Sequence, residues 1–358
     1  MFKEMCVPFA AVALTVSVPI AGRAQTPPKK AAAGAGVSVS RKFVPPKTPW
    51  GDPDISGNFT TKDEANTPFE RPDEFAGKRI EDITPEELAA VVKARQQEAV
   101  EGAPFLTGSR TNGIAIGVPI HWLDHLDAVN SRPWFVVDPP DGKIPPLSEA
   151  GKQRAAAVTA ARAQRGTADS YTDRWTGDRC IAWGIGVARV VPGVYGNSHQ
   201  ILQTKGYVAI RYEMVHETRI IPIEGRGAAR PHTPASLPSS YGDATARWEG
   251  NTLVVDTVNY DGKIGYRGSA QGLHTIERFT RVAPNKLEWS ATIEDPTTWT
   301  RPWTFAIPWT EDDTQMIHEY ACHEGNYGIR NILAGARSDE KRGIVPSDGP
   351  AVPPEQQE

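Results

Sequence analysis

The spacing of apolar residues changes near residue 183, and this change predicts the architecture of the chain. From there to residue 323, apolar and polar side chains alternate with the period of two that is typical of strands with one buried face. The clearest alternation lies in residues 207–216, where the side chains on one face are Val208, Ile210, Tyr212, Met214 and His216. This part of the chain is therefore predicted to be a sheet.

Short polar turns join the alternating segments in pairs. Residues 249–251, 283–285 and 311–313 each separate two such segments and contain the Gly, Asn, Asp or Pro of tight turns. Successive hairpins describe an antiparallel meander of about eight strands. We expect a mainly β fold in which the meander closes into a barrel of the calycin or lipocalin type, or curls over helices that wrap it.

Two helices are predicted in the irregular segment that precedes the strands. The first begins with Thr84 as N-cap, Pro85 at the first helical position and Glu87 completing a capping box. The second is Ala-rich and spans residues 148–165. Both contain too few apolar residues to form a core of their own, so we expect them to wrap the sheet.

Residues 1–24 are typical of a secretory signal peptide, with Lys3 near the start, an apolar run over residues 7–20 and small residues at positions 22 and 24. That run is about 14 residues long, whereas a membrane-spanning helix needs about 20. We therefore expect a periplasmic or secreted protein with no membrane span in the mature chain. The remaining regions are predicted as a disordered linker at 25–47, a wrapping segment at 48–174, the barrel-like domain at 175–337 and a disordered tail at 338–358.

Removal of the signal peptide leaves Cys180 and Cys322 as the only cysteines. In an oxidising compartment two such residues are expected to form a disulfide, here between positions 142 residues apart. The alternatives are a pair of metal thiolates or a reactive thiol beside His323.

Composition and charge exclude several classes of protein. The 32 Gly and 31 Pro argue against a helical bundle, and ten Trp with nine Tyr argue against a disordered chain. The formal charge of −4 leaves no general basic surface, so nucleic acid is not expected as a partner. The chain also lacks the GxSxG, phosphate-loop, HExxH and Rossmann glycine motifs, and no cofactor is implied.

The densest polar segment is residues 317–327, which we expect to begin as a strand. Glu319 and His323 then share a face but lie about 13 Å apart along it, so they meet only if the chain turns back near Gly325. Glu324 follows directly, and His323 would stand at a strand end facing an open barrel mouth. The alternative is a histidine bound to a loop carbonyl beside the disulfide.

A second candidate lies on the strand over residues 274–281, where His274 and Arg278 share one face. A His and an Arg that project together suit the binding and polarisation of a carbonyl or carboxylate group. The alternative is the outward polar face of a half-exposed sheet, because Phe279 on the opposite side suits a core.

Five further residues are candidates for substrate binding. They lie at predicted strand ends, on a covering loop or in a Trp-rich segment, and they are His216, His232, Asp243, Trp299 and Trp303. Aromatic platforms suit planar or sugar-like ligands. The alternatives are a surface salt network around His216 and a place in the barrel core for the tryptophans.

His121 and His125 have the i, i+4 spacing of metal ligands on a helix, with Asp124 between them. Their setting between Pro119 and Pro133 is not typical of a helix, and no further ligand lies nearby. If this segment binds a metal, we expect zinc held by these three residues.

Five motifs resemble a family of secreted bacterial proteins of unassigned activity. They are WGDPDISG at 50–57, DPPDG at 138–142, RWEGNTLVV at 247–255, DPTTWTRPW at 295–303 and YACHEGNY at 320–327. The resemblance covers most of the mature chain and implies that residues 48–337 form one unit. It also implies that His216, His232, His274 and His323 belong to the shared pattern, whereas His121, His125 and His199 depart from it.

These observations favour an exported enzyme that uses acid–base chemistry on a small organic substrate, of the lyase, hydratase or isomerase type. His323 and His274 would be base and acid, Arg278 the anion stabiliser, and Glu319 or Glu324 an orienting group. One alternative is a periplasmic ligand-binding barrel without turnover, and another is a metal-dependent hydrolase at His121 and His125.

Overall fold

The structure is a computed structural model, and it describes residues 43–102, 109–111, 114–116, 128–193, 195–225, 231–269, 271–314 and 317–344. These described residues belong to one compact unit. The predicted signal peptide, most of the predicted linker and the histidines at 121 and 125 lie outside the described residues. In the part of the chain that is described, no helix is both long and apolar enough to cross a membrane.

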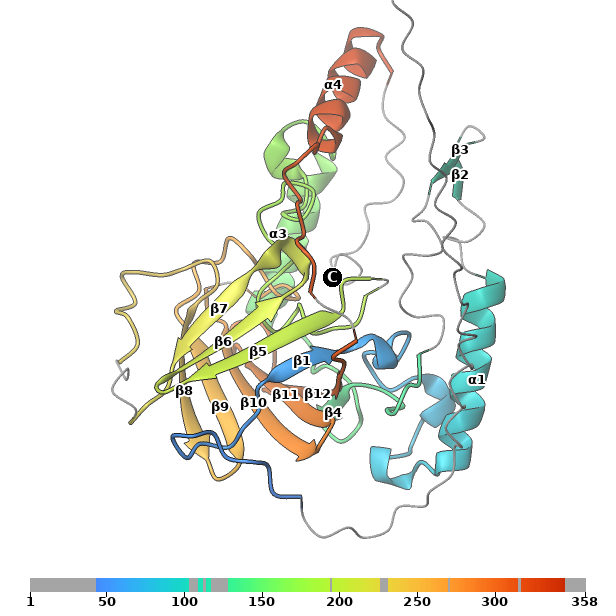
Figure 1. The fold of residues 1–358 in the computed structure, drawn as a ribbon. Coiled ribbons are helices and arrows are strands. Elements are labelled where there is room, and N and C mark those ends of the chain that lie inside the picture. Colours follow the sequence, from blue (N-terminus) through green and yellow to red (C-terminus); the bar gives the residue numbers. More distant parts are fainter. Residues whose placement is uncertain are drawn as a thin grey trace, which may run out of the picture. The chain divides into compact units, whose positions relative to one another are not determined.

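One antiparallel sheet dominates the described residues, and its edges approach each other so that it is nearly closed into a barrel (Figure 1). The order is β7-β6-β5-β1-β12-β11-β10-β9-β8, with β4 also paired to β12. A parallel bridge between Ile223, just after β7, and Ala246 of β8 joins the two edges. The predicted mainly β, barrel-like fold is confirmed.

The strands of this sheet are β1 (Gly57–Thr60), β4 (Val136–Asp138), β5 (Ser198–Thr204), β6 (Tyr207–Tyr212), β7 (Thr218–Pro222), β8 (Asp243–Glu249), β9 (Thr252–Val258), β10 (His274–Ala283), β11 (Lys286–Glu294) and β12 (Trp303–Glu311). A separate pair consists of β2 (Ser109–Thr111) and β3 (Ile114–Ile116).

Two of the three predicted hairpins are present, and the third is wrong. β8 pairs with β9 and β10 with β11, as expected. The segment after β12 forms no strand among the described residues, so the strand predicted at 315–322 is absent there. The reason is that both edges of β12 are already occupied, by β11 on one side and by β1 and β4 on the other.

Both predicted helices are present. α1 (Pro85–Gly102) begins at the predicted capping box, in which Glu87 N–H donates to Thr84 Oγ1 and Thr84 N–H donates to Glu87 Oε2. α3 (Glu149–Ala163) is capped by Ser148 Oγ, which accepts a hydrogen bond from Gly151 N–H at 3.0 Å. α4 (Gly328–Lys341) was not predicted and includes the first residues of the predicted tail. Short 3₁₀ helices span Lys62–Glu64, Asp73–Phe75, Ile80–Asp82, Tyr171–Asp173 and Met214–His216.

Large aromatic side chains fill the interior of the barrel. The fully buried ones include Trp289, Trp303, Trp309, Phe279 and Phe305. The ring of Trp303 packs edge-on against that of Trp299, which is only 3% exposed. Burial therefore places both tryptophans in the core. This was the stated alternative to a role as a ligand platform.

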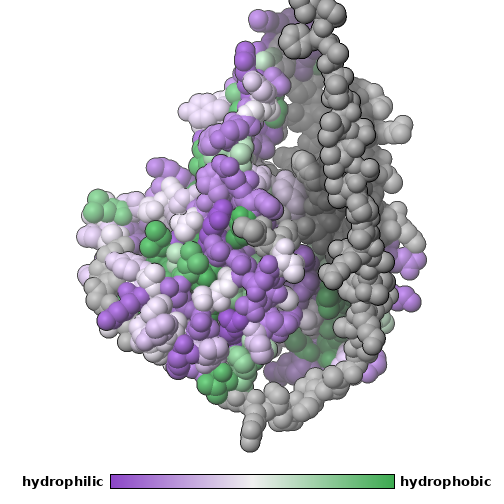
Figure 2. Space-filling view, in the orientation of Figure 1, coloured by the Kyte–Doolittle hydropathy of each residue, from purple (hydrophilic) through white to green (hydrophobic). Residues whose placement is uncertain are grey.

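The outer face of the sheet also carries apolar side chains. Leu202 of β5 and Ile220 of β7 each lie opposite Ala209 of β6, and both are more than half exposed. Figure 2 shows hydrophobic surface over these strands, surrounded by polar residues.

Candidate functional site

Four neighbouring strands bring titratable side chains together on the outer face of the sheet. Asp256 of β9 lies opposite Thr245 of β8, and His274 of β10 lies opposite Glu294 of β11. The residues next to them, such as Thr257 and Thr275, point into the core, because successive side chains of a strand face opposite sides. His232 reaches the same face from the loop before β8. We call His232, Asp243, Asp256, His274 and Glu294 the histidine–carboxylate cluster.

Imidazole and carboxylate groups alternate through the histidine–carboxylate cluster. Asp256 Oδ1 lies 3.2 Å from His232 Nε2 and 3.3 Å from His274 Nε2, so one carboxylate oxygen serves both rings. The other ring nitrogens face further carboxylates, with Glu294 Oε2 3.0 Å from His274 Nδ1 and Asp243 Oδ2 3.2 Å from His232 Nδ1. All four ring nitrogens therefore face a carboxylate oxygen.

Local hydrogen bonds fix the loop that carries His232. Thr233 N–H donates to Asp243 Oδ2 at 2.7 Å, the same oxygen that the imidazole contacts. Asn259 Nδ2 donates to Thr233 Oγ1 at 3.0 Å and to the carbonyl oxygens of Pro234 and Leu237 at 3.1 Å. These bonds position the ring of His232 over β8 and β9.

The electrostatics of the cluster favour a protonated ring at His274. The hydrogen bond from His274 is the main reason that the pKa of Asp256 is lowered, and the same bond raises the pKa of His274 against the opposing effect of burial. A ring donates from both nitrogens only as an imidazolium ion. About 30% of each His side chain is exposed, so solvent reaches the rings.

Arg278 lies on the same outer face of β10 as His274, as predicted, four residues further along the strand. It pairs in register with Val254 of β9 and Ser290 of β11, and its side chain is half-buried. Among the described residues it has no ion pair. Strand geometry places the Cα atoms of His274 and Arg278 about 13 Å apart. One substrate can therefore contact both side chains only because the arginine side chain is long.

The other predicted catalytic residues lie elsewhere. Glu319 and Glu324 line a cleft beside the disulfide between Cys180 and Cys322, and this bond confirms the predicted pairing. His323 is exposed next to that bond, and no contact among the described residues connects it with His274. The structure therefore does not bring together the predicted base and acid.

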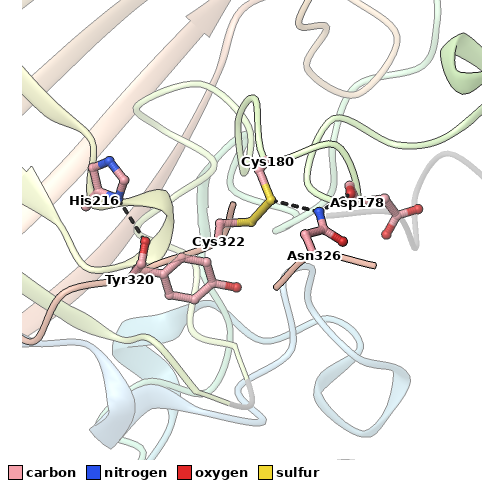
Figure 3. The surroundings of a disulfide bond; sticks show 6 residues. All are labelled: Asp178, Cys180, His216, Tyr320, Cys322 and Asn326. Atoms are coloured by element: carbon pink, nitrogen blue, oxygen red, sulfur yellow. Dashed lines mark hydrogen bonds between the residues drawn. A yellow bond between two sulfur atoms is a disulfide. The ribbon is translucent and has the colours of Figure 1, made fainter. Parts of the chain in front are cut away.

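His216 also lies apart from the histidine–carboxylate cluster. Its Nδ1 atom is 2.8 Å from the carbonyl oxygen of Tyr320, and its ring is exposed (Figure 3). The contact joins the end of the Met214–His216 turn to the C-terminal segment. This is the kind of contact that the sequence left open for His323, a ring bound to a loop carbonyl, whereas the alternative for His216 was a surface salt network.

The interior of the barrel holds a second set of charges that sequence reasoning did not assign. Arg219 of β7 and Glu277 of β10 form an ion pair at 2.7 Å, and both side chains are at least nine-tenths buried. Tyr212 Oη accepts from Arg219 at 3.1 Å, and Trp289 Nε1 donates to Glu277 at 3.2 Å. Burial opposes the charge of Arg219, but Glu277 beside it holds the pKa of Arg219 above its ordinary value. Their burial gives these groups a structural role.

His199 of β5 is the most buried histidine of the described residues. Its ring lies against Trp309 with centroids 4.7 Å apart, and neither ring nitrogen has a hydrogen-bond partner there. Burial lowers the pKa of His199 to about 3, with a further contribution from the charge of Arg189. The ring is therefore neutral near pH 7.

Asp256 and Glu294 are the functional candidates that sequence reasoning missed. Asp256 is the single charged residue of the apolar run that forms β9, and Glu294 closes β11. A single carboxylate in an otherwise apolar strand could have marked Asp256 as a candidate. Its histidine partners could not be predicted, because they depend on the register of the strands.

The cluster has no metal-like geometry. Within the described ranges, no group of three or more His, Cys, Asp or Glu residues is arranged to hold a metal ion. Comparison of the chain with models of known families and with curated proteins finds no match.

Proposed function

We propose that this protein is an exported enzyme that uses acid–base chemistry on a small organic substrate, of the lyase, hydratase or isomerase type, at the histidine–carboxylate cluster. The observation that carries the proposal is the position of the His274 ring between two carboxylates, one of which it shares with His232. The pKa of His274 is raised by its bond to Asp256, which favours a transferable proton on the ring, and such a proton is the requirement for a general acid.

The substrate enters at the Glu294 side of the ring. Glu294 is the more exposed of the two carboxylates that contact His274, with 36% of its side chain accessible against 25% for Asp256. A substrate oxygen that displaces Glu294 from Nδ1 accepts the proton of His274 and leaves the Glu294 carboxylate beside the substrate as the base. Asp256 and His232 hold the ring and its charge from the other side.

An elimination of water illustrates the proton balance. Glu294 takes the proton from a carbon next to a carboxylate, and the electron pair of that C–H bond forms the C=C bond. The C–O bond breaks with its pair on oxygen, and His274 protonates that oxygen so that water leaves. Glu294 then returns its proton to His274 across their 3.0 Å contact. Arg278 pairs with the substrate carboxylate further along β10.

The packing of the barrel favours this proposal over a lipocalin-like binding protein. Trp289, Trp303 and Trp309 fill the interior that such a protein would keep for its ligand. The metal-dependent hydrolase rests on His121 and His125, which lie outside the described residues. The disulfide is compatible with the proposed export.

Deuterium exchange tests the proposal without knowledge of the substrate. The purified protein is incubated in D₂O with a mixture of hydroxy, keto and unsaturated carboxylic acids, and C–H to C–D exchange is followed by NMR. We expect exchange into at least one compound through reversible loss and addition of water. The His274→Gln variant is expected to lose about a hundredfold or more of this exchange, because the leaving oxygen then has no positioned acid to protonate it.

The matched control is His318→Gln, which removes an exposed histidine outside the histidine–carboxylate cluster. It is expected to retain the exchange rate of the unaltered protein. Exchange that survives in His274→Gln, or that is lost equally in His318→Gln, would contradict the proposed site.

A further inference from the structure

A cleft of about 560 Å³ lies beside the disulfide, well away in sequence from the residues of the histidine–carboxylate cluster. One wall is formed by residues 175–195 and the other by residues 319–332. The bond between Cys180 and Cys322 joins the two walls, and Asn326 Nδ2 adds a hydrogen bond to Asp178 O at 3.2 Å (Figure 3). Its volume is that of a small-molecule site.

Four aromatic residues line this cleft. Trp175 and Trp183 pack edge to face with centroids 4.5 Å apart, and Tyr195 and Tyr320 line the same space. A side-chain carbon at Gly177 would collide with the Trp175 ring, so the glycine lets the backbone lie against that ring and hold it in place. Burial raises the pKa of Tyr320 to about 12, helped by the hydroxyl of Tyr195, so the phenol of Tyr320 stays neutral near pH 7.

The charged residues of the cleft are all acidic. Asp178 is paired with Arg174, which lies 2.8 Å away. Glu319 and Glu324 are exposed at the opposite wall, and neither has an ion pair within the described ranges. Among the described residues that line the cleft there is no Lys, Arg or His. Neutral aromatic faces next to unpaired carboxylates attract cations and repel anions.

We propose that this cleft binds an organic cation, a quaternary ammonium ion or protonated amine, between the tryptophan rings and the two glutamates. The faces of Trp175 and Trp183 receive the positively charged group, and Glu319 and Glu324 supply the opposite charge. This binding is independent of the catalysis proposed at the histidine–carboxylate cluster, because the two sites share no residue.

Titration of the purified protein with choline, followed by tryptophan fluorescence and calorimetry, tests the proposal. The neutral isostere 3,3-dimethyl-1-butanol has the same shape without the charge. Choline is expected to bind at least about tenfold more tightly than the isostere, which is the scale of a partly desolvated cation–π contact with charge support.

Three variants locate the binding. Glu319→Gln/Glu324→Gln is expected to weaken choline binding about tenfold, and Trp175→Leu by a similar factor, whereas Trp175→Phe keeps an aromatic face and loses less. Glu86→Gln removes an exposed charge outside the cleft and is the matched control. Both glutamates of the double variant are exposed, so its folding is expected to match that of the control.

Several outcomes would overturn the proposal. These are no saturable choline binding, equal affinity for choline and its isostere, or equal losses in the double variant and in Glu86→Gln. Saturation by glucose or cellobiose without any by choline would assign the aromatic cleft to sugars instead. The exchange assay with carboxylic acids reports only on the histidine–carboxylate cluster, so the two proposals fail separately.

Discussion

At the scale of single residues, the ion pair buried in the barrel is expected to affect the free energy of unfolding most strongly. Arg219 and Glu277 have little solvent to stabilise them, so each depends on the other and on Tyr212 and Trp289. Removal of one partner leaves an uncompensated charge in the interior, whereas removal of both leaves an apolar gap.

We therefore predict that Arg219→Met lowers the free energy of unfolding by about 3–5 kcal/mol. The double variant Arg219→Met/Glu277→Leu is expected to recover most of that loss. Urea unfolding of the three proteins measures both differences. If the double variant is as unstable as Arg219→Met, the unpaired charge of Glu277 is not the cause of the lost stability.

His199 makes stability depend on pH. Its pKa in the folded protein is about 3, against an ordinary value of 6.5, so between these values only the unfolded chain takes up the proton. This contribution to stability is complete above pH 6.5 and is lost as the pH falls, by about 1.4 kcal/mol for each pH unit.

His199→Phe removes this dependence while keeping an aromatic ring against Trp309. Relative to this variant, the unaltered protein is predicted to lose about 2 kcal/mol of stability between pH 6.5 and pH 5. Urea unfolding at both pH values gives the difference. If the two proteins differ in stability by the same amount at pH 6.5 and at pH 5, the His199 ring accepts a proton in the folded protein.

At the scale of elements, the disulfide joins the segment before β5 to the segment after β12. Cys180 is buried, and the residues that follow it, including Ile185, Val187 and Val190, belong to the same core as the strands. The bond closes a loop of 142 residues, so it restricts the unfolded chain over a large part of the sequence.

We predict that Cys180→Ser/Cys322→Ser lowers the free energy of unfolding by about 3–5 kcal/mol, since loop-closure entropy sets the upper end of this range. Thermal unfolding with and without a reductant checks the result. The unaltered protein under reducing conditions is expected to match the double variant. A loss in the variant without any effect of the reductant would contradict the explanation.

At the scale of the whole molecule, local sequence signals predicted elements better than their assembly. The turn at Gly250 and the alternation on either side of it are local, and they predicted the β8–β9 hairpin correctly. The pairing of β1 with β12 joins residues about 250 positions apart, for example Phe59 and Glu311, and no turn signals it. Because β1 occupies that edge, the strand expected after β12 has no place to pair.

The candidate site was also predicted only in part, because its assembly depends on pairing between strands that are distant in the sequence. His232, His274 and Asp243 were singled out as separate candidates, and the strand register brings them together around Asp256. The expected pairing of His274 with His323 assumed that both stand at one barrel mouth. His323 instead lies beside the disulfide, in a segment that is not part of the sheet.

The central claim is that the histidine–carboxylate cluster favours a transferable proton on His274 by raising the pKa of its ring. An NMR titration of the ¹⁵N-labelled imidazole rings measures this directly, with His274→Gln used to assign the signal. We predict that His274 titrates above 6.5 and that Asp256→Asn lowers its pKa, because the bond to Asp256 is the main cause of the shift. A pKa at or below 6.5, or one that Asp256→Asn leaves unchanged, would contradict the account.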